Sequence, residues 1–287
     1  MGETPPVSGD AHPARRLWQV LETLHAVTYF APSVREANSA AGLRGFWMAY
    51  FACRAAPLGA VGPAPVAAAF AGFRPSMVAR ALPDAWGYVQ PAGCVALRLE
   101  AATAALQAAG VDDIACGDVA DRLDPVIDGL DLTGRPLAAA NADLPRPDDP
   151  VARLWQAATT LREHRGDGHV AAVVAAGLSG LHAHELQARR SGIDAADLQA
   201  ARGWDPAEWA AAEADLAAKG LDGETGTSAL AAIEARTDEL AWTGGLGVLD
   251  DDGVDEIVGA LAPSVRAVLA TGWIRFPNPM ALPRAEL

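Results

Sequence analysis

The segment 162–169, which reads REHRGDGH, gathers side chains that are suited to proton transfer. His164 and His169 can act as a general acid or a general base near neutral pH. A nearby carboxylate, such as that of Asp167, can fix the tautomer of an imidazole that serves as a base. We therefore treat His164 and His169 as the candidate catalytic residues.

Two arginines of the same segment are suited to anion binding. Arg162 and Arg165 can each hold a carboxylate or a phosphate through two parallel hydrogen bonds, and Asp167 is a candidate ligand contact beside them. A structural alternative remains open, in which Gly166 and Gly168 break a helix. In that case Asp167 caps the next helix, and Arg165 pairs with a neighbouring acid.

A second candidate group precedes this segment. His25 and Tyr29 are four residues apart, so they share one face of a predicted helix. Arg44 and Trp47, on a helix predicted over 33–54, are expected to face the same cavity. All four are candidate ligand contacts, because pockets for small molecules combine apolar walls with a few polar groups. The alternative is that His25 is a core histidine bonded to a carbonyl and Trp47 is ordinary core.

The sequence predicts no metal site and names no cofactor. His164 and His169 are five residues apart, which matches no zinc-ligand spacing. The glycine motif of dinucleotide-binding proteins, the phosphate-binding loop and the nucleophile elbow are all missing. The cysteines are odd in number and widely spaced, so we expect reduced, buried thiols at Cys53, Cys94 and Cys116.

The chain contains an internal repeat. Residues 13–24 and 150–161 are identical at seven of twelve positions at an offset of 137, with Trp18 matching Trp155. Weaker matches follow along both halves at similar offsets. Such a period is too long for a solenoid repeat. It predicts a duplicated domain whose two copies pack about a pseudo-two-fold axis.

The repeat and the helical periodicity give the expected organisation. We expect a disordered leader over 1–12, copy one over 13–132, a linker over 133–150 and copy two with a C-terminal tail over 151–287. Helices are predicted in copy one over 13–30, 33–54, 65–71, from Pro75, 92–109 and 113–130. In copy two they are predicted over 151–164, 169–190, 195–201, 206–219, 229–242 and 253–270, with a small hairpin over 221–229.

Composition limits the class of protein. Of 287 residues, 51% are hydrophobic, chiefly alanine, leucine and valine, which favours helices over sheets. A formal net charge of −14 opposes binding to nucleic acid and to anionic membranes. The uncharged stretch 55–73 is broken by prolines and glycines, so it is not predicted to span a membrane. The leader has no signal-peptide pattern, and we expect a cytoplasmic protein.

Residues 193–240 resemble the MarR-type winged-helix regulators. A short helix, a turn at Gly203, a helix ending in KGL, a polar hairpin and a long helix follow one another in the order of that motif. With its repeat, the whole chain resembles an internally duplicated, MarR-like winged-helix family of actinobacteria. The resemblance implies a triangular pseudo-dimer with a small-molecule pocket between the dimerisation helices and the winged lobe.

In such a family the second helix of the motif, 206–219, and the wing, 221–229, would contact DNA. That helix has Lys219 as its only basic residue, and the wing has none. Copy one is less acidic, with Arg74 and Arg80 near its second helix. A DNA reader needs lysines and arginines that meet phosphates and base edges. We therefore expect DNA recognition to be lost.

The expected fold is mainly α, with two fused winged helix-turn-helix copies that form a MarR-like pseudo-dimer. The predicted function is binding of a small, partly apolar and anionic molecule between the copies of a monomeric chain. Two alternatives stay open. One is an enzyme that uses His164, His169 and Arg165 in the same cavity, and the other is a winged-helix transcriptional regulator.

Overall fold

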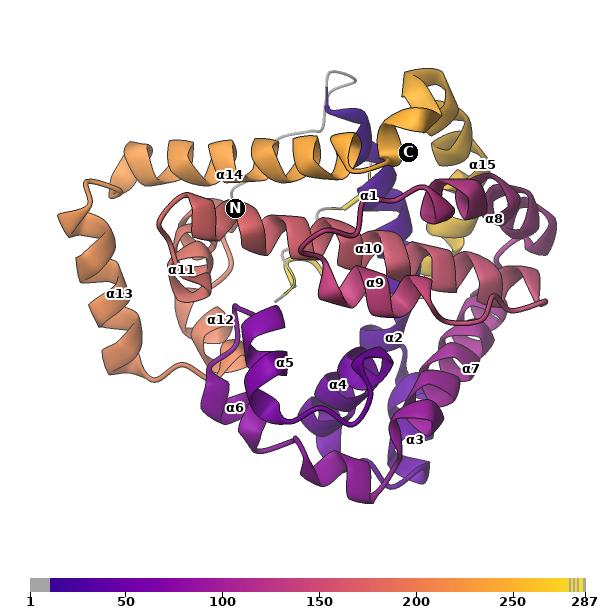
Figure 1. Cartoon of the computed structure of the whole chain (residues 1–287), viewed down its shortest axis with the longest axis horizontal. Helices are drawn as coiled ribbons and strands as arrows, with labels where there is room; N and C mark the ends of the chain where they lie inside the picture. The colour runs from indigo at the N-terminus through magenta and orange to yellow at the C-terminus, as the bar shows by residue number, and fades with distance from the viewer. Residues whose placement is uncertain (1–10, 279, 281, 283, 286–287) are drawn as a thin grey trace.

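The computed structural model describes residues 11–278, 280, 282, 284 and 285, and these form helices and no strand (Figure 1). The first half contains α1 (Pro13–His25), α2 (Val27–Phe30), α3 (Pro32–Ala40), α4 (Gly45–Ala55), α5 (Pro63–Ala69), α6 (Pro75–Ala79), α7 (Pro91–Ala109) and α8 (Asp113–Asp128). The second half contains α9 (Pro136–Ala142), α10 (Pro150–Ala175), α11 (Gly180–Ser191), α12 (Ala195–Arg202), α13 (Pro206–Ala218), α14 (Gly223–Thr243) and α15 (Asp250–Ala270). Most of the leader expected over 1–12 lies outside the described residues.

Local capping explains several helix boundaries. Asp205 accepts a hydrogen bond from the backbone N–H of Glu208, whose side chain accepts one from the N–H of Asp205, so a capping box fixes the start of α13. The side chain of Asp194 caps α12 by accepting a hydrogen bond from the backbone N–H of Ala196 at 2.7 Å. Gly203 has a φ of 77°, which favours glycine in the turn between α12 and α13.

The break predicted within 162–169 is wrong, because α10 runs without interruption through Gly166 and Gly168. Gly168 serves close packing instead of a turn. A Cβ at this position would lie 2.8 Å from the guanidinium of Arg135, which donates hydrogen bonds to the carbonyl oxygens of His164 and Leu240.

Three other expectations are corrected. The hairpin predicted over 221–229 is the start of α14, which begins at Gly223. The linker over 133–150 contains α9, whose residues Leu137, Ala138 and Asn141 are buried. The single helix predicted over 33–54 is two helices, α3 and α4, separated by a turn around Gly42, whose φ is 97°.

The two halves exchange their packing partners. The first helix of the first half, α1, packs mainly on α15 of the second half. Reciprocally, the N-terminal helix of the second half, α10, packs on α8 of the first half. The helices α1 and α10 also contact each other, and Figure 1 shows α10 crossing the middle of the molecule. The main hydrophobic core therefore combines residues of both halves.

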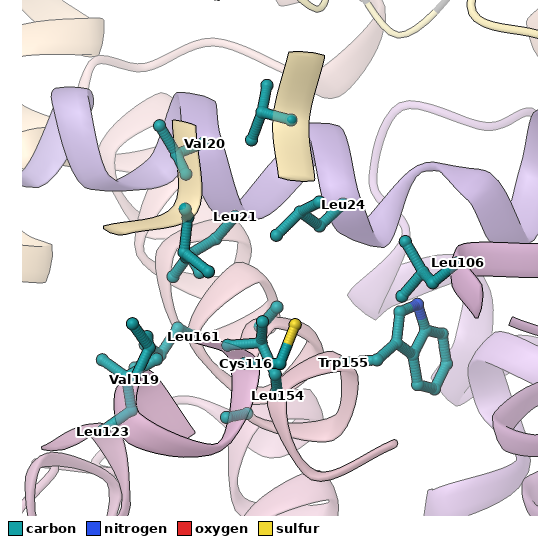
Figure 2. Close-up of a cluster of buried hydrophobic side chains, with 14 of the residues drawn as sticks. Val20, Leu21, Leu24, Leu106, Cys116, Val119, Leu123, Leu154, Trp155 and Leu161 are labelled. Atoms are coloured by element: carbon teal, nitrogen blue, oxygen red, sulfur yellow. The ribbon is translucent and has the colours of Figure 1, made fainter. Parts of the chain in front are cut away.

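The largest core lies where these four helices meet. Figure 2 shows part of it, with Leu21 and Leu24 from α1, Leu154 and Trp155 from α10 and Leu123 from α8. Burial of such side chains is the main driving force of folding. The described cysteines are free and buried. Within the described residues, no helix is long and apolar enough to cross a lipid bilayer.

Candidate functional site

A cavity of about 220 Å³ lies between the first half of the chain and α10. Its walls come from α1–α4, α7 and α10. The apolar side consists mainly of aromatic rings, and the polar side includes the buried side chains of Arg98, Glu163 and His25. This mixture of apolar walls and a few polar groups is typical of sites for small organic molecules.

A directed chain of hydrogen bonds ends in this cavity. The hydroxyl of Thr159 donates to the carbonyl oxygen of Trp155 at 2.8 Å, so its oxygen accepts from His25 Nδ1 at 3.0 Å. The other ring nitrogen, Nε2, then accepts from the hydroxyl of Tyr29 at 3.2 Å. Burial lowers the pKa of His25 well below its usual value, so the imidazole is neutral at pH 7.

Tyr50 lies beside Tyr29, with ring centroids 5.2 Å apart. Its hydroxyl accepts a hydrogen bond from Arg54 Nη1 at 3.1 Å. Burial raises the pKa of Tyr50, but nearby guanidinium groups, Arg54 first among them, lower it by more, so its pKa lies below the usual value. The cavity therefore offers two phenolic hydroxyls of different acidity.

A buried ion cluster closes one side of the cavity. Glu163, which is 1% exposed, accepts two hydrogen bonds from Arg54, at 2.9 and 2.8 Å, and one from Arg162 at 2.7 Å. Burial raises the pKa of Glu163, but the two arginines lower it by more, so the carboxyl is ionised at pH 7. Arg162 also pairs with Glu22 at 3.3 Å.

The structure brings some of the predicted ligand contacts to this cavity. His25 and Tyr29 line it, and Arg162 lies beside them, with its Cζ 5.8 Å from the ring centroid of Tyr29. Arg44 is exposed and stacks over Tyr88, outside the lining residues. Trp47 packs among aromatic rings of the first half and does not line the cavity either.

The other predicted residues lie elsewhere on α10. The carboxylate of Asp167 accepts hydrogen bonds from the backbone N–H groups of Leu137 and Ala138, so it caps α9, and burial raises its pKa to about 6. His164 Nε2 lies 3.2 Å from the carbonyl oxygen of Asp131. Burial, followed by the charge of Arg135, lowers the pKa of His164 to about 4.

Arg165 and His169 belong to a second cluster, which they form with side chains of α14. Arg165 pairs with Asp238 at 2.9 Å and with Glu234 at 3.1 Å, and its guanidinium covers Trp18 at 4.4 Å. His169 Nδ1 lies 3.1 Å from Thr237 Oγ1. The hollow beside this cluster has a volume of only about 10 Å³. Arg165 and His169 thus share one cluster with α14, whereas His164 and Asp167 each have other partners, and the four residues share no cavity.

Arg54, Arg98 and Glu163 were not among the site residues predicted from the sequence. For Arg54 and Arg98 the signal was a charged residue within a largely apolar helical segment, as in VALRL for Arg98, whereas Glu163 stands among other charged residues. Such a residue is either exposed or buried with partners, and the periodicity alone does not decide between the two. Among the described residues, no group of three or more His, Cys, Asp or Glu side chains is arranged to hold a metal ion.

Two groups of helices, one from each half of the chain, touch each other. We call residues 45–79, with α4–α6, the first lobe and residues 180–218, with α11–α13, the second lobe. The indole N–H of Trp204 donates to the carbonyl oxygen of Gly72 at 2.9 Å. A Cβ at Gly180 would lie 2.0 Å from the carbonyl oxygen of Ala71, so the two backbones are in close contact.

An ion pair joins the same surfaces. Arg74, just before α6, pairs with Asp205 at 3.0 Å and with Glu208 at 2.9 Å. Both acids belong to the N-terminal turn of α13. The N-terminal ends of α6 and α13 therefore lie next to each other where the two lobes meet.

Comparison with known proteins gives one match. Residues 14–275 match a family that is described as a helix-turn-helix family. No curated protein and no solved structure matches the chain.

Proposed function

The chain belongs to a helix-turn-helix family, and we propose that it uses this scaffold to bind a small organic molecule in the cavity beside α10. The observation that carries the proposal is the cavity itself, with about 220 Å³ of space and buried charged groups in its wall. A dry cavity of ~150 Å³ is large enough to bind benzene. The space therefore suits one ring with a polar substituent.

The lobe contacts argue against the usual role of the motif. A two-fold DNA reader presents its recognition helices to half-sites about 34–36 Å apart. Here the N-terminal turn of α13 is held by Arg74 of the first lobe. Its exposed face carries Glu213 and Asp215 against Lys219, so it would meet phosphates with negative charge. We therefore propose that this chain does not recognise DNA.

A duplicated, MarR-like pseudo-dimer is the architecture that we propose for this scaffold, without the expected wing. The exchanged packing of α1 on α15 and α10 on α8 is what a fused pair of former partners would retain. The lining residues of the large cavity and of the small hollow also support a duplicated architecture. The large cavity is lined by His25, Thr28, Trp155 and Thr159, and the small one by residues 137 positions away, Arg162, Arg165, Trp18 and Glu22.

The alternative of an enzyme with His164 and His169 as acid and base receives less support. These side chains contact different elements, and neither lines the large cavity. A general base must come within hydrogen-bond reach of the proton that it removes. Ligand binding needs no such arrangement and agrees with the directed hydrogen bonds of Tyr29 and His25.

A thermal-shift screen with a library of small organic compounds tests the proposal. A compound at 100 times its Kd stabilises the folded chain by roughly 2.7 kcal/mol. Ala49, 4% exposed, lines the cavity, so Ala49→Leu should fill it and abolish the shift. Ala68→Leu, on the exposed side of α5, is the matched control and should keep the shift. A compound that stabilises wild type and Ala49→Leu alike would place binding elsewhere.

A further inference from the structure

Arg98, on α7, has a buried positive charge that lacks a carboxylate partner within the described chain. Its side chain lines the cavity, and the residue is 4% exposed. Nη1 donates to the carbonyl oxygen of Cys53 at 3.1 Å, and Nη2 donates to the amide oxygen of Asn141 at 2.7 Å. Both acceptors are neutral. The third donor position, Nε, is buried without a hydrogen-bond partner.

The nearby acids are already engaged by other arginines. Glu163 forms its ion pairs with Arg54 and Arg162. Glu22 pairs with Arg162. Among these five buried or half-buried side chains, three positive charges face two negative ones. Arg54 and Arg162 each pair with a carboxylate in this group, whereas Arg98 pairs with none.

Such an arrangement is costly in the empty protein. A buried charge is destabilising unless an opposite charge and hydrogen bonds compensate it. Burial also lowers the pKa of Arg98, which reflects the same cost. A single negative charge brought in by a ligand would remove this cost and satisfy the free donor.

The rest of the cavity favours a ring next to that charge. Arg98 Cζ lies 5.8 Å from the ring centroid of Trp155, on which His25 stacks with centroids 5.4 Å apart. The rings of Tyr29, Tyr50 and Phe46 contribute further wall. Aromatic side chains provide large apolar contact with preferred stacking geometries.

We infer that the ligand of this cavity is a small aromatic monocarboxylate whose carboxylate pairs with Arg98. One carboxylate would pair with Arg98, the buried arginine of the cavity wall that lacks a carboxylate partner among the described residues. The inference rests on the proposed function, since it names the chemical class that the proposed site would bind. It assigns to Arg98 the role of anchor for the charged group.

Pairs of probes that differ only in charge test the inference by calorimetry. We choose benzoate with benzamide, phenylacetate with phenylacetamide, and 1-naphthoate with 1-naphthamide. At least one acid is expected to bind wild type at least about tenfold more tightly than its amide, a difference of ~1.4 kcal/mol. In Arg98→Met this preference should disappear. Arg44→Met, outside the cavity, is the matched control and should retain it.

Each outcome of this experiment supports or rejects the role of Arg98 or the chemical class of the ligand. Equal binding of acids and amides, or a preference that survives in Arg98→Met, overturns the role of Arg98. If only the amides bind, the proposed ligand cavity stands, but the inference that its ligand carries a carboxylate is rejected. If no probe binds wild type at millimolar concentration, the ligand class is wrong, and the compound library then tests the cavity separately. Should Arg98→Met not fold, the comparison of acid with amide in wild type still decides the class.

Discussion

Trp155 lines the open cavity, and Trp18, 137 positions earlier in the sequence, lines the small hollow. The two indoles have different neighbours. His25 stacks on Trp155 at 5.4 Å, whereas the guanidinium of Arg165 covers Trp18 at 4.4 Å. Arg165 occupies the position that Thr28 holds in the first half. The small side chain of Thr28 therefore leaves the large cavity open. The long side chain of Arg165, which Glu234 and Asp238 hold in place, fills the small hollow.

Removing this arginine should destabilise the fold. Arg165→Ala leaves Asp238, which is 2% exposed, with Arg15 as its remaining ion partner. Breaking a buried ion pair from one side costs about 3–5 kcal/mol. We expect a loss of roughly 3 kcal/mol in the free energy of unfolding by urea. Arg16→Ala, whose partner Asp255 is exposed, is the control and should cost less than ~1 kcal/mol. Equal losses would contradict the account of the closed hollow.

The packing role of Gly168 gives a second prediction. Glycine in a helix normally costs about 0.5–1 kcal/mol relative to alanine. At Gly168 the new Cβ would displace Arg135 from its two carbonyl partners, so Gly168→Ala is expected to destabilise by roughly 1–2 kcal/mol. Gly259 in α15 has open space around the same position, and Gly259→Ala should stabilise. Chemical unfolding measures the change in the free energy of unfolding of each variant. If both substitutions stabilise the chain, the contact between position 168 and Arg135 is refuted.

Stability should fall in acid partly because of His164. The unfolded chain binds a proton at this residue near pH 6.5, but burial keeps the folded chain from binding it until about pH 4. The unfolded state thus holds more protons between these values, so the free energy of unfolding decreases as pH falls through them. Between pH 8 and pH 4 the residue contributes roughly 3 kcal/mol of this decrease. In His164→Gln the decrease from pH 8 to pH 4 should be smaller by that amount, and an unchanged decrease would show that the histidine does not titrate this way.

The joined lobes predict the outcome of a DNA-binding experiment. With Arg74 bound to the first turn of α13, and with acids on the rest of that helix, duplex DNA should not be retarded in a gel-shift assay at low salt. The DNA upstream of its own coding sequence is the appropriate probe. A complex that dissociates as salt rises would instead restore the regulator function.

The helices of the second motif were predictable because their boundaries are set locally. Asp194, Gly203 and the pair Asp205–Glu208 fix where α12 and α13 begin and end. The course of α10 was not predictable in this way. Gly166 and Gly168 favour a break in isolation, and only the distant Arg135 explains a glycine in the middle of a helix. Tertiary contact overrides local preference there.

The candidate site was predictable only where one helical turn connects its members. His25 and Tyr29 lie four residues apart and both reach the cavity. The charged segment of α10 was expected to act as a unit, but successive residues of a helix point about 100° apart, so its members diverge. Arg98 and Glu163 come from α7 and α10, and their meeting depends on how those helices pack. Spacing in the sequence carries no such information.

The central claim is that the cavity beside α10 holds a small organic molecule. Native mass spectrometry of the full chain, purified from its own host, measures this directly. The account predicts one bound small molecule per chain, lost in Ala49→Leu and kept in Ala68→Leu. Two molecules per chain would contradict the closed second hollow, and a spectrum of bare chain together with no stabilising compound in the library would contradict the claim itself.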